Sequence, residues 1–371
     1  MKYKSSYAAC LAAIAIVANV ASPVAAANKQ YRKALPGYVY HFPQDHFSHD
    51  EFKTEWWYYT GHLESKDGKR YGYELTFFRT GADNPAIDKK SAWGLDNFYL
   101  AHFAVSDLSG KKFYFYEKLN RAALGLAGAS QSAYRVHNEN WSAMQLGDKY
   151  VLKADGPDFA IDLLLTDLKH PVVHGKDGVS QKANCVGCAS HYYSMTRLET
   201  RGLITDHGKT SEVRGLSWMD HEFGSNQLTE EQSGWDWFSL QLDDNREFMA
   251  YLLRRADGTV EKQSSGTIVE ADGSARHLGL GDFVVTPTKY WVSPKSKGKY
   301  PMGWKLSSKV ADLDVTVESE MPDQELNTKR STGVTYWEGA VRLSGKSKGK
   351  AVKGAGYVEM TGYAQKFASK I

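Results

Sequence analysis

The sequence predicts an all-β protein with two antiparallel domains, each a barrel or a sandwich. Aromatic residues, which favour strands, are abundant: 22 Tyr, 15 Phe and 10 Trp in 371 residues. Short alternating runs are separated by Asp-Gly pairs, which are typical of hairpin turns. These pairs stand at Asp67–Gly68, Asp155–Gly156, Asp177–Gly178, Asp257–Gly258 and Asp272–Gly273. No long run has a convincing helical period, and the length suits about two domains.

The first predicted hairpin carries large rings on both faces. Its strands cover residues 55–63 and 71–79 and read EWWYYTGHL and YGYELTFFR. Because side chains alternate along a strand, such a sheet must be covered on one side, and its other side can line a cavity. Alternation places Trp57, Tyr59 and Leu63 on one face, and Trp56, Tyr58, Thr60 and His62 on the other. Two more hairpins are predicted, one from residues 98–107 and 112–118 and one from 150–154 and 158–165.

A second block begins near Gly234 and repeats this pattern. Residues 234–242 (GWDWFSLQL) and 247–255 (EFMAYLLRR) match the first hairpin across a polar turn. We therefore predict two similar β domains, at residues 28–224 and 225–371. A last hairpin joins strands starting at Tyr336 and Gly356 through a basic turn at 346–353. Residues 122–132, rich in Ala, Gly and Ser, predict a loop or at most one short helix.

Residues 1–27 have the pattern of a secretory signal. Two lysines precede an apolar run over 8–20, and three alanines at 25–27 form a small-residue cleavage site. We expect the mature chain to begin near Asn28 and to be exported, to the periplasm or the extracellular space. No later run approaches the ~20 apolar residues of a membrane helix, so no transmembrane segment is expected in the mature chain.

Charge and cysteine content exclude other classes. The 46 Lys and Arg nearly balance the 43 Asp and Glu, and there is no basic stripe, so we expect no nucleic-acid partner. The mature chain holds two cysteines, Cys185 and Cys188. A structural zinc site needs four ligands and no second pair exists. For an exported protein we therefore predict a local, structural disulfide.

The densest polar constellation is SWMDHEFG, residues 217–224, followed by Asp236 between two tryptophans. Here Asp220, His221 and Glu222 lie beside apolar rings, where loss of hydration raises a carboxyl pKa toward that of a working general acid. The alternative is a buried hydrogen bond, from Asp220 or Glu222 to His221, that ties the two domains together.

Metal and cofactor sites are not predicted. Neighbouring residues of a strand point to opposite faces, so Asp220, His221 and Glu222 cannot converge on one ion. Three histidines in residues 41–49 are irregularly spaced around Pro43, which favours an ordered arm laid over the barrel. The nucleophile-elbow, P-loop and zinc-protease patterns are absent from the sequence.

Several motifs in order resemble one family. They are PQDHFSHDEFKTEWWYYTGHL from Pro43, YGYELTFFR, GLSWMDHEFG, GWDWFSLQL, YWEG and GYVEMTGY up to Tyr363. The chain resembles the family that groups carotenoid 1,2-hydratase (hydroxyneurosporene synthase) with AttH-like exported proteins, and it is more similar to the AttH-like branch. The resemblance implies two lipocalin-like β-barrels packed together. The D-H-x-x-G core of the hydratases matches Asp220, His221 and Gly224, whereas Glu222 replaces the more frequent Asn.

The resemblance and the residues together suggest two functions. The first is a cofactor-independent hydratase, a hydro-lyase that protonates a prenyl-type double bond and adds water to the cation. Asp220 is the expected proton donor, His221 would orient it or hold the water, and Asp236 is the reserve carboxyl. The second is a non-catalytic carrier of a lipophilic ligand, associated with an ABC-type export system. A third possibility is that the aromatic faces only pack the domains together.

Both main functions need an aromatic cavity for an isoprenoid or lipid-like small molecule, at the junction of the barrels. The residues expected to bind the ligand are Glu55, Trp56, Trp57, Tyr58, His62, His102, Trp218, Glu222, Trp235 and Trp237. A carboxyl group that reaches the cavity would favour the enzyme, and a lining of hydrocarbon and rings alone would favour the carrier.

Overall fold

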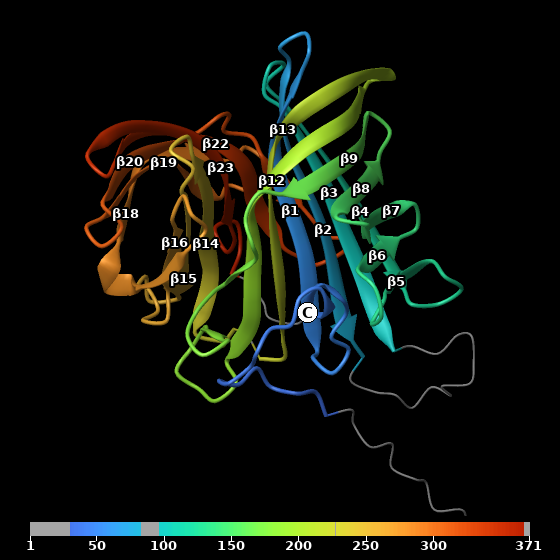
Figure 1. The fold of residues 1–371 in the computed structure, drawn as a ribbon, viewed down its shortest axis with the longest axis horizontal. Coiled ribbons are helices and arrows are strands. Elements are labelled where there is room, and N and C mark those ends of the chain that lie inside the picture. The colour runs from blue at the N-terminus through green and yellow to red at the C-terminus, as the bar shows by residue number, and fades with distance from the viewer. Residues whose placement is uncertain (1–29, 83–95, 227, 367–371) are drawn as a thin grey trace, which may run out of the picture.

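The computed structural model describes residues 30–82, 96–226 and 228–366. The predicted signal at 1–27 lies outside these ranges. Within them the chain forms 23 strands, two short 3-10 helices and no α-helix, which confirms the all-β prediction. The strands build two curled sheets that lie side by side (Figure 1). No helix among these residues has the length and apolar character to span a membrane.

The first sheet contains every strand up to Gly224. Its hydrogen-bonded path is β4-β3-β2-β1-β13-β12-β9-β8-β7-β6-β5, and all its pairs are antiparallel. The sheet curls until β4 contacts β5 and β6 at its other end. Its strands are β1 (Thr54–Ser65), β2 (Arg70–Gly81), β3 (Asn97–Asp107), β4 (Lys112–Arg121), β5 (Ala127–Ala129), β6 (Arg135–Asn138), β7 (Trp141–Leu146), β8 (Lys149–Asp155), β9 (Phe159–Asp167), β10 (Val172–Val173), β11 (Ser180–Gln181), β12 (Ala189–Asp206) and β13 (Lys209–Gly224).

The second sheet begins at Gln232 and has the path β17-β16-β15-β14-β23-β22-β20-β19-β18. Its edge strands β17 and β18 are joined by the short helix η2, so this sheet also curls on itself. Its elements are β14 (Gln232–Leu242), β15 (Glu247–Arg255), β16 (Ser265–Val269), β17 (Ala275–Gly279), η2 (Leu280–Asp282), β18 (Val284–Val292), β19 (Lys299–Ser308), β20 (Leu313–Ser319), β21 (Glu325–Asn327), β22 (Thr335–Ser347) and β23 (Lys350–Met360).

The predicted hairpins are confirmed, with small corrections. Strand pairs β1–β2, β3–β4, β8–β9, β14–β15 and β22–β23 all form as antiparallel hairpins. The turn of the last hairpin is shorter than the predicted 346–353, because β22 ends only at Ser347 and β23 already begins at Lys350. Residues 122–132 form no helix and include strand β5.

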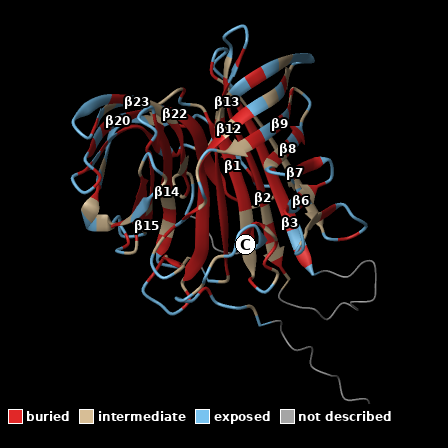
Figure 2. Cartoon of the chain, viewed as in Figure 1, coloured by how far each residue is buried: buried red, intermediate tan, exposed pale blue. Residues whose placement is uncertain are grey.

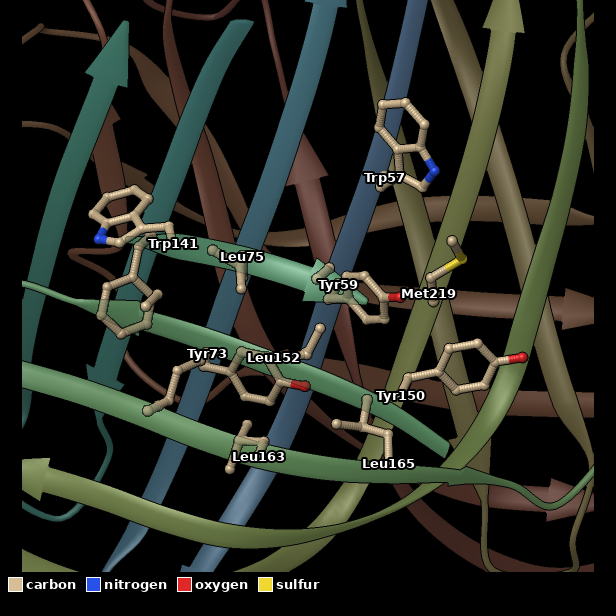
Figure 3. Packing of buried hydrophobic residues seen from close by; sticks show 14 of the residues in the cluster. Trp57, Tyr59, Tyr73, Leu75, Trp141, Tyr150, Leu152, Leu163, Leu165 and Met219 are labelled. Carbon is tan, nitrogen blue, oxygen red and sulfur yellow. The ribbon is translucent and has the colours of Figure 1, made fainter. Parts of the chain in front are cut away.

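Each sheet wraps its own apolar core. Trp57, Tyr59 and Leu63 lie in the core of the first sheet, as the alternation of β1 predicts. Figure 3 shows this core, where rings from β1, β2 and β7 meet aliphatic side chains of β8 and β9. The second core contains Phe238, Trp304 and Trp337. Two closed cores mean that each sheet buries one face without help from the other.

A third apolar cluster lies between the two sheets. Across this interface β1 faces β23, β2 faces β22 and β12 faces β14. The outward faces of these strands and of their neighbours β13 and β15 bury Tyr58, Tyr192, Trp218, Trp237 and Tyr251. The central strands of the molecule are therefore largely buried on both sides, and exposed residues gather in the loops (Figure 2). The residues that face this interface are the ones that build the candidate site.

Candidate functional site

A cavity of about 840 Å³ lies between the two domains. This volume is within the range of small-molecule sites, and residues of both sheets line it. Aromatic rings and carboxyl groups are both prominent in the lining. Its aromatic members are Trp56, Tyr58, Phe78, Phe98, Tyr192, Trp235, Trp237, Tyr251 and Tyr336. Its acidic members are Glu55, Glu74, Asp220, Glu222 and Glu359.

Strand register brings Asp220 to the first sheet's side of this cavity. Asp220 of β13 lies opposite Tyr58 of β1 and opposite Ser194 of β12. Its Oδ1 accepts hydrogen bonds from Ser194 Oγ and from Trp218 Nε1, the latter at 2.6 Å. Its Oδ2 accepts from the Tyr192 hydroxyl at 2.6 Å, and Trp237 Nε1 of the second sheet donates to that hydroxyl at 3.0 Å. Asp220 is thus held by residues of both domains.

The protonation of Asp220 suits an acid catalyst. Burial raises the pKa of Asp220 to about 7, although its hydrogen bonds from Ser194, Tyr192 and Trp218 act in the opposite direction. The carboxylate of Glu222 adds to the increase. Near neutral pH Asp220 therefore exists in both forms, as a general acid requires.

Three further carboxyl groups gather at the interface, two from the second sheet and one from the first. Glu338 of β22 lies directly opposite Glu359 of β23, and Glu74 of β2 faces them from the first sheet. Burial raises the pKa of Glu74 to about 7 and, with the repulsion of Glu74 and Asp220, that of Glu359 to about 8. Burial and the charges of Glu74 and Glu359 raise the pKa of Glu338 well above its usual range. We call Glu74, Glu338 and Glu359 the acid wall.

Two other acids of the cavity have basic partners. Lys182 Nζ lies 2.9 Å from Glu222 Oε1, and its ammonium group also stacks on the rings of Tyr192 and Tyr251. Arg79 Nε lies 3.0 Å from Glu55 Oε2. In the described part of the chain, by contrast, no salt bridge reaches Asp220 or any member of the acid wall.

His221 does not orient Asp220, which corrects the sequence prediction. As the next residue of β13, it points to the opposite face, into the first barrel. There His221 Nε2 lies 2.8 Å from Glu55 Oε1, and its Nδ1 lies 2.9 Å from the Tyr193 hydroxyl. Burial lowers the pKa of His221, so the ring is neutral. Its role in this structure is a buried hydrogen bond within one domain, which does not tie the two domains together.

The arm before β1 brings His49 to the same carboxylate. His49 Nδ1 lies 2.8 Å from Glu55 Oε1, so His49, Glu55 and His221 form a group whose ligand-type atoms lie within 4.8 Å of one another. The argument from strand alternation concerns neighbours on one strand, so it does not apply to this group. Its members come from the arm before β1, from β1 and from β13. Burial lowers the pKa of His49, but hydrogen bonds to Asp45 and Glu55 outweigh burial and raise it to about 9. The positive charges of protonated His49 and of the Arg79 guanidinium both disfavour a metal cation here. We therefore still expect no metal at this group.

Two other predicted residues do not reach the cavity. Asp236 points away from it on β14 and binds Arg254 Nε at 3.1 Å and the Tyr363 hydroxyl at 3.0 Å, so it is not the expected reserve acid. Trp57 lies in the first core and stacks on His221. Both corrections have one cause, since Trp57 and Asp236 alternate with the cavity residues of their strands.

The remaining predicted residues lie at or beside the cavity. Glu55, Trp56, Tyr58, His102, Glu222, Trp235 and Trp237 line it. His102 bonds the Tyr336 hydroxyl at 2.7 Å, and burial lowers the pKa of His102 to about 3. Trp218 is placed behind Asp220, to which it donates. His62 lies at the interface outside the main cavity and bonds the Gly356 carbonyl oxygen at 2.8 Å.

Cys185 and Cys188 are joined by a disulfide in the structure. The closed loop begins three residues after Lys182, and the Lys182 backbone amide donates a hydrogen bond to the Cys188 carbonyl oxygen at 2.8 Å. The disulfide therefore lies next to the Lys182–Glu222 pair of the cavity.

Sequence reasoning missed five cavity or interface residues: Glu74, Lys182, Tyr192, Glu338 and Glu359. A signal for the three acids exists in the sequence. Each is a single acidic residue inside an otherwise apolar strand, in YELTFF, YWEGAV and YVEM. A lone carboxyl in such a strand is either paired or functional, since an unpaired buried charge is costly. Lys182 and Tyr192 carry no comparable signal, because their position depends on the loop before β12.

The fold and this site define a class: a two-domain all-β protein whose barrels enclose an acidic, aromatic cavity. The AttH-like family pattern matches residues 33–363. The chain belongs to the AttH-like family, which confirms the resemblance drawn from its motifs. A search among curated protein sequences gave no significant match.

Solved structures share the architecture. An AttH protein from Nitrosomonas europaea is 31% identical, with a TM-score of 0.81 over 90% of this chain and 99% of that one. Kievitone hydratase from Nectria haematococca is 17% identical, with a TM-score of 0.69 over 91% of this chain and 98% of that one. CghA, solved with Sch210972, is 12% identical, with a TM-score of 0.53 over 90% of this chain and 97% of that one. The last two likenesses show the shared fold alone.

Proposed function

We propose that this protein is a cofactor-independent hydratase that adds water to a prenyl-type double bond of a lipophilic substrate. The observation that carries the proposal is Asp220: a buried carboxyl at the cavity with a pKa raised to about 7 by burial. A carboxyl at the cavity is the feature that distinguishes the enzyme from the carrier. It supplies the proton that an alkene needs and that rings alone cannot give.

The reaction has two steps. First, the alkene π pair takes the proton of Asp220, directly or through the Tyr192 hydroxyl, which leaves a tertiary cation and the Asp220 carboxylate. Then a water molecule adds its oxygen to the cation, and one of its protons returns to a carboxylate of the cavity. Atoms and charge balance, and the acid is regenerated without a cofactor.

The cavity lining suits the cation between these steps. The faces of Trp and Tyr rings attract a positive charge, and the attraction reaches ~2 kcal/mol or more where water is excluded. Trp56, Trp235 and Trp237 line the cavity, and Trp237 approaches Tyr58 edge to face with ring centres 5.2 Å apart. The new carboxylate of Asp220 would stabilise the same cation electrostatically.

The neighbours in fold give further support. One of them is kievitone hydratase, whose fold matches nearly the whole of this chain. At 17% identity the fold is shared, but the substrate is not transferred. The substrate class proposed here, an isoprenoid or lipid-like alkene, comes from the aromatic lining.

The alternative is a non-catalytic carrier of a lipophilic ligand that delivers it to an ABC-type export system. The aromatic lining favours a lipophilic ligand equally well in this case. For both functions we propose an exported protein, periplasmic or extracellular. The secretory pattern at residues 1–27 and the Cys185–Cys188 disulfide, a bond typical of oxidising compartments, support export.

The test compares Asp220→Asn with the purified parent protein on a panel of prenylated substrates in H₂¹⁸O. We expect hydration by the parent protein to fall as pH rises above about 7, because Asp220 must be protonated. We expect Asp220→Asn to lose about 10²–10⁴-fold in rate, the usual effect of removing a general acid. Asp236→Asn is the matched control, because Asp236 is buried but points away from the cavity.

The two functions predict different results. In the hydratase, ligand affinity stays within a few-fold in Asp220→Asn while turnover is lost. In the carrier, the parent protein binds the ligands, forms no ¹⁸O-labelled product, and Asp220→Asn changes nothing. Melting temperatures of all variants separate both results from loss of the fold.

A further inference from the structure

The acid wall has no counter-charge within the described residues. Glu74 and Glu338 are buried and Glu359 is partly buried. In the described part of the chain no lysine or arginine forms a salt bridge with them, whereas Glu55 and Glu222 each have one. Their hydrogen-bond donors are neutral: Thr76 and Tyr336 to Glu74, Tyr58 to Glu338, and Trp235 to Glu359. Three acids in one place therefore have no basic partner among the described residues, and their ionised forms would need one.

Two oxygen atoms of the wall also lack a hydrogen-bond partner. Glu74 Oε2 and Glu338 Oε2 are buried and unsatisfied, although an unpaired buried polar atom costs about 1–3 kcal/mol. Glu74 lines the cavity, so a ligand there can reach it. Natural proteins keep such costs where a ligand removes them.

The wall suits an organic cation better than a metal ion. In the described part of the chain, the group of three ligand-type side chains within 4.8 Å is His49, Glu55 and His221, so the wall carboxyls do not converge that closely. Trp56, Trp235 and Trp237 line the same cavity, and aromatic faces are the usual partners of substituted ammonium groups.

We propose that the cavity selects a lipophilic amine: its ammonium group lies at Glu74 and Glu359, which line the cavity beside the buried Glu338, and its hydrocarbon body lies against the tryptophans. The proposal rests on the proposed use of this cavity as a ligand site, but not on hydration. A protonated amine in the cavity would give the unsatisfied Glu74 Oε2 a hydrogen-bond donor. Its charge would also stabilise the ionised form of Glu359, which lies opposite Glu338 across β22 and β23.

The experiment measures binding of two probes by tryptophan fluorescence and calorimetry. The probes are trimethylgeranylammonium, whose charge does not depend on pH, and geraniol, its neutral counterpart. At pH 7.5 we expect the cation to bind at least about tenfold more tightly than geraniol, a ratio that corresponds to one net charge interaction of about 1.4 kcal/mol. The carboxyl groups of the acid wall should lose protons when the cation binds. The buffer takes up these protons, so the measured heat of binding should depend on the ionisation enthalpy of the buffer.

The pH dependence gives a second measure that needs no variant. The preference for the cation should increase from pH 6 to pH 9, as Glu74 and Glu359 ionise. The remaining titratable or charged groups that line the cavity are Lys53, Glu55, Tyr58, Arg79, His102, Lys182, Tyr192, Asp220, Glu222, Tyr251 and Tyr336. Asp220 contributes to the same increase, so variants of the wall are needed to assign the effect.

Glu74→Gln and Glu338→Gln should each reduce the cation preference about three- to tenfold and leave geraniol affinity unchanged. Glu325→Gln is the control, because Glu325 is a buried acid beside Tyr300 in the second barrel, away from the cavity. Equal affinities for the two probes, or a cation preference unaffected by both wall variants, would overturn the inference and leave the proposed function intact. Binding of neither probe would overturn both. Cation binding without any hydration would keep the inference and reject the enzyme.

Discussion

Neighbouring residues of β13 belong to two opposite electrostatic environments. On the inner face, His221 meets Glu55, whose charge is matched by Arg79 and His49. On the outer face, Asp220 is also buried and lies near the acid wall of β2, β22 and β23. Neither Asp220 nor the acid wall has a salt bridge in the described part of the chain. The two faces of β13 thus meet different clusters. The charges cancel in the cluster around Glu55 and do not cancel in the cluster around Asp220.

The comparison separates a cluster whose charges are fixed from the one that we propose as functional. Burial would raise the pKa of Glu55, but Arg79, His221 and His49 outweigh burial and lower it well below its usual range, so Glu55 stays ionised in every ordinary condition. Burial raises the pKa of Asp220 and Glu74 to about 7, so these groups change their charge near neutral pH. Only groups of the second kind exchange protons with a ligand, and such groups cluster at functional sites.

The largest expected effect comes from breaking the balanced cluster with Arg79→Met. This change leaves the buried Glu55 charge without its main partner and also removes hydrogen bonds to the His49 and Phe52 carbonyl oxygens, both 2.9 Å. We expect a loss of about 3–5 kcal/mol in the free energy of unfolding, measured by urea denaturation. The exposed Arg32–Glu51 pair provides the control, since Arg32→Met should cost below about 1 kcal/mol. Equal losses in the two variants would contradict the comparison.

A smaller effect of opposite sign is expected for Glu74→Gln. The folded pKa of Glu74 is about 7, above its unfolded value, so Glu74 stabilises the fold fully only below the unfolded pKa. That contribution is lost as pH rises through about 7. The neutral Gln avoids the loss, so the variant should match the parent at pH 5 and exceed it by roughly 1–3 kcal/mol at pH 8.5.

Glu55→Gln sharpens this prediction because its trend is reversed. The folded pKa of Glu55 is lowered, so its stabilising effect is present above the unfolded pKa and is lost only as pH falls. Glu55→Gln should therefore be destabilising at pH 8.5 and less so at pH 4. Thermal unfolding of both variants between pH 4 and pH 8.5 measures the two trends. Parallel trends would show that the two faces of the sheet do not differ in charge balance.

The sequence predicts the sheets better than the site. The reason is that the hairpins depend on residues close together in the sequence, whereas the site depends on residues far apart in it. A hairpin such as β1–β2 depends on local alternation and a turn, both visible in the sequence. Alternation also places Trp56 and Trp57 on opposite faces, but does not say which face meets the other domain. That choice depends on packing between strands far apart in the chain, such as β1 against β23.

The errors at the site have the same origin. Asp220 was found because its motif is dense, but its partners Tyr192 and Ser194 come from β12, nearly thirty residues earlier. The acid wall joins β2 to β22 and β23, a contact that no local pattern reveals. His221 was paired with Asp220 because they are adjacent in sequence, although adjacency on a strand separates side chains.

The smallest effect is expected from the double variant Cys185→Ser, Cys188→Ser. It tests whether the position of Lys182, which pairs with Glu222 in the cavity, depends on the disulfide. The closed loop is short, so the entropic stabilisation is about 2 kcal/mol at most. The backbone amide of Lys182 also donates a hydrogen bond to the Cys188 carbonyl oxygen, and its ammonium group contacts Glu222, Tyr192 and Tyr251. We therefore expect a slightly lower melting temperature and affinity for trimethylgeranylammonium within a few-fold of the parent protein. If binding changes strongly while the fold is retained, the disulfide is part of the site, and the balance between Lys182 and Glu222 is set by its redox state.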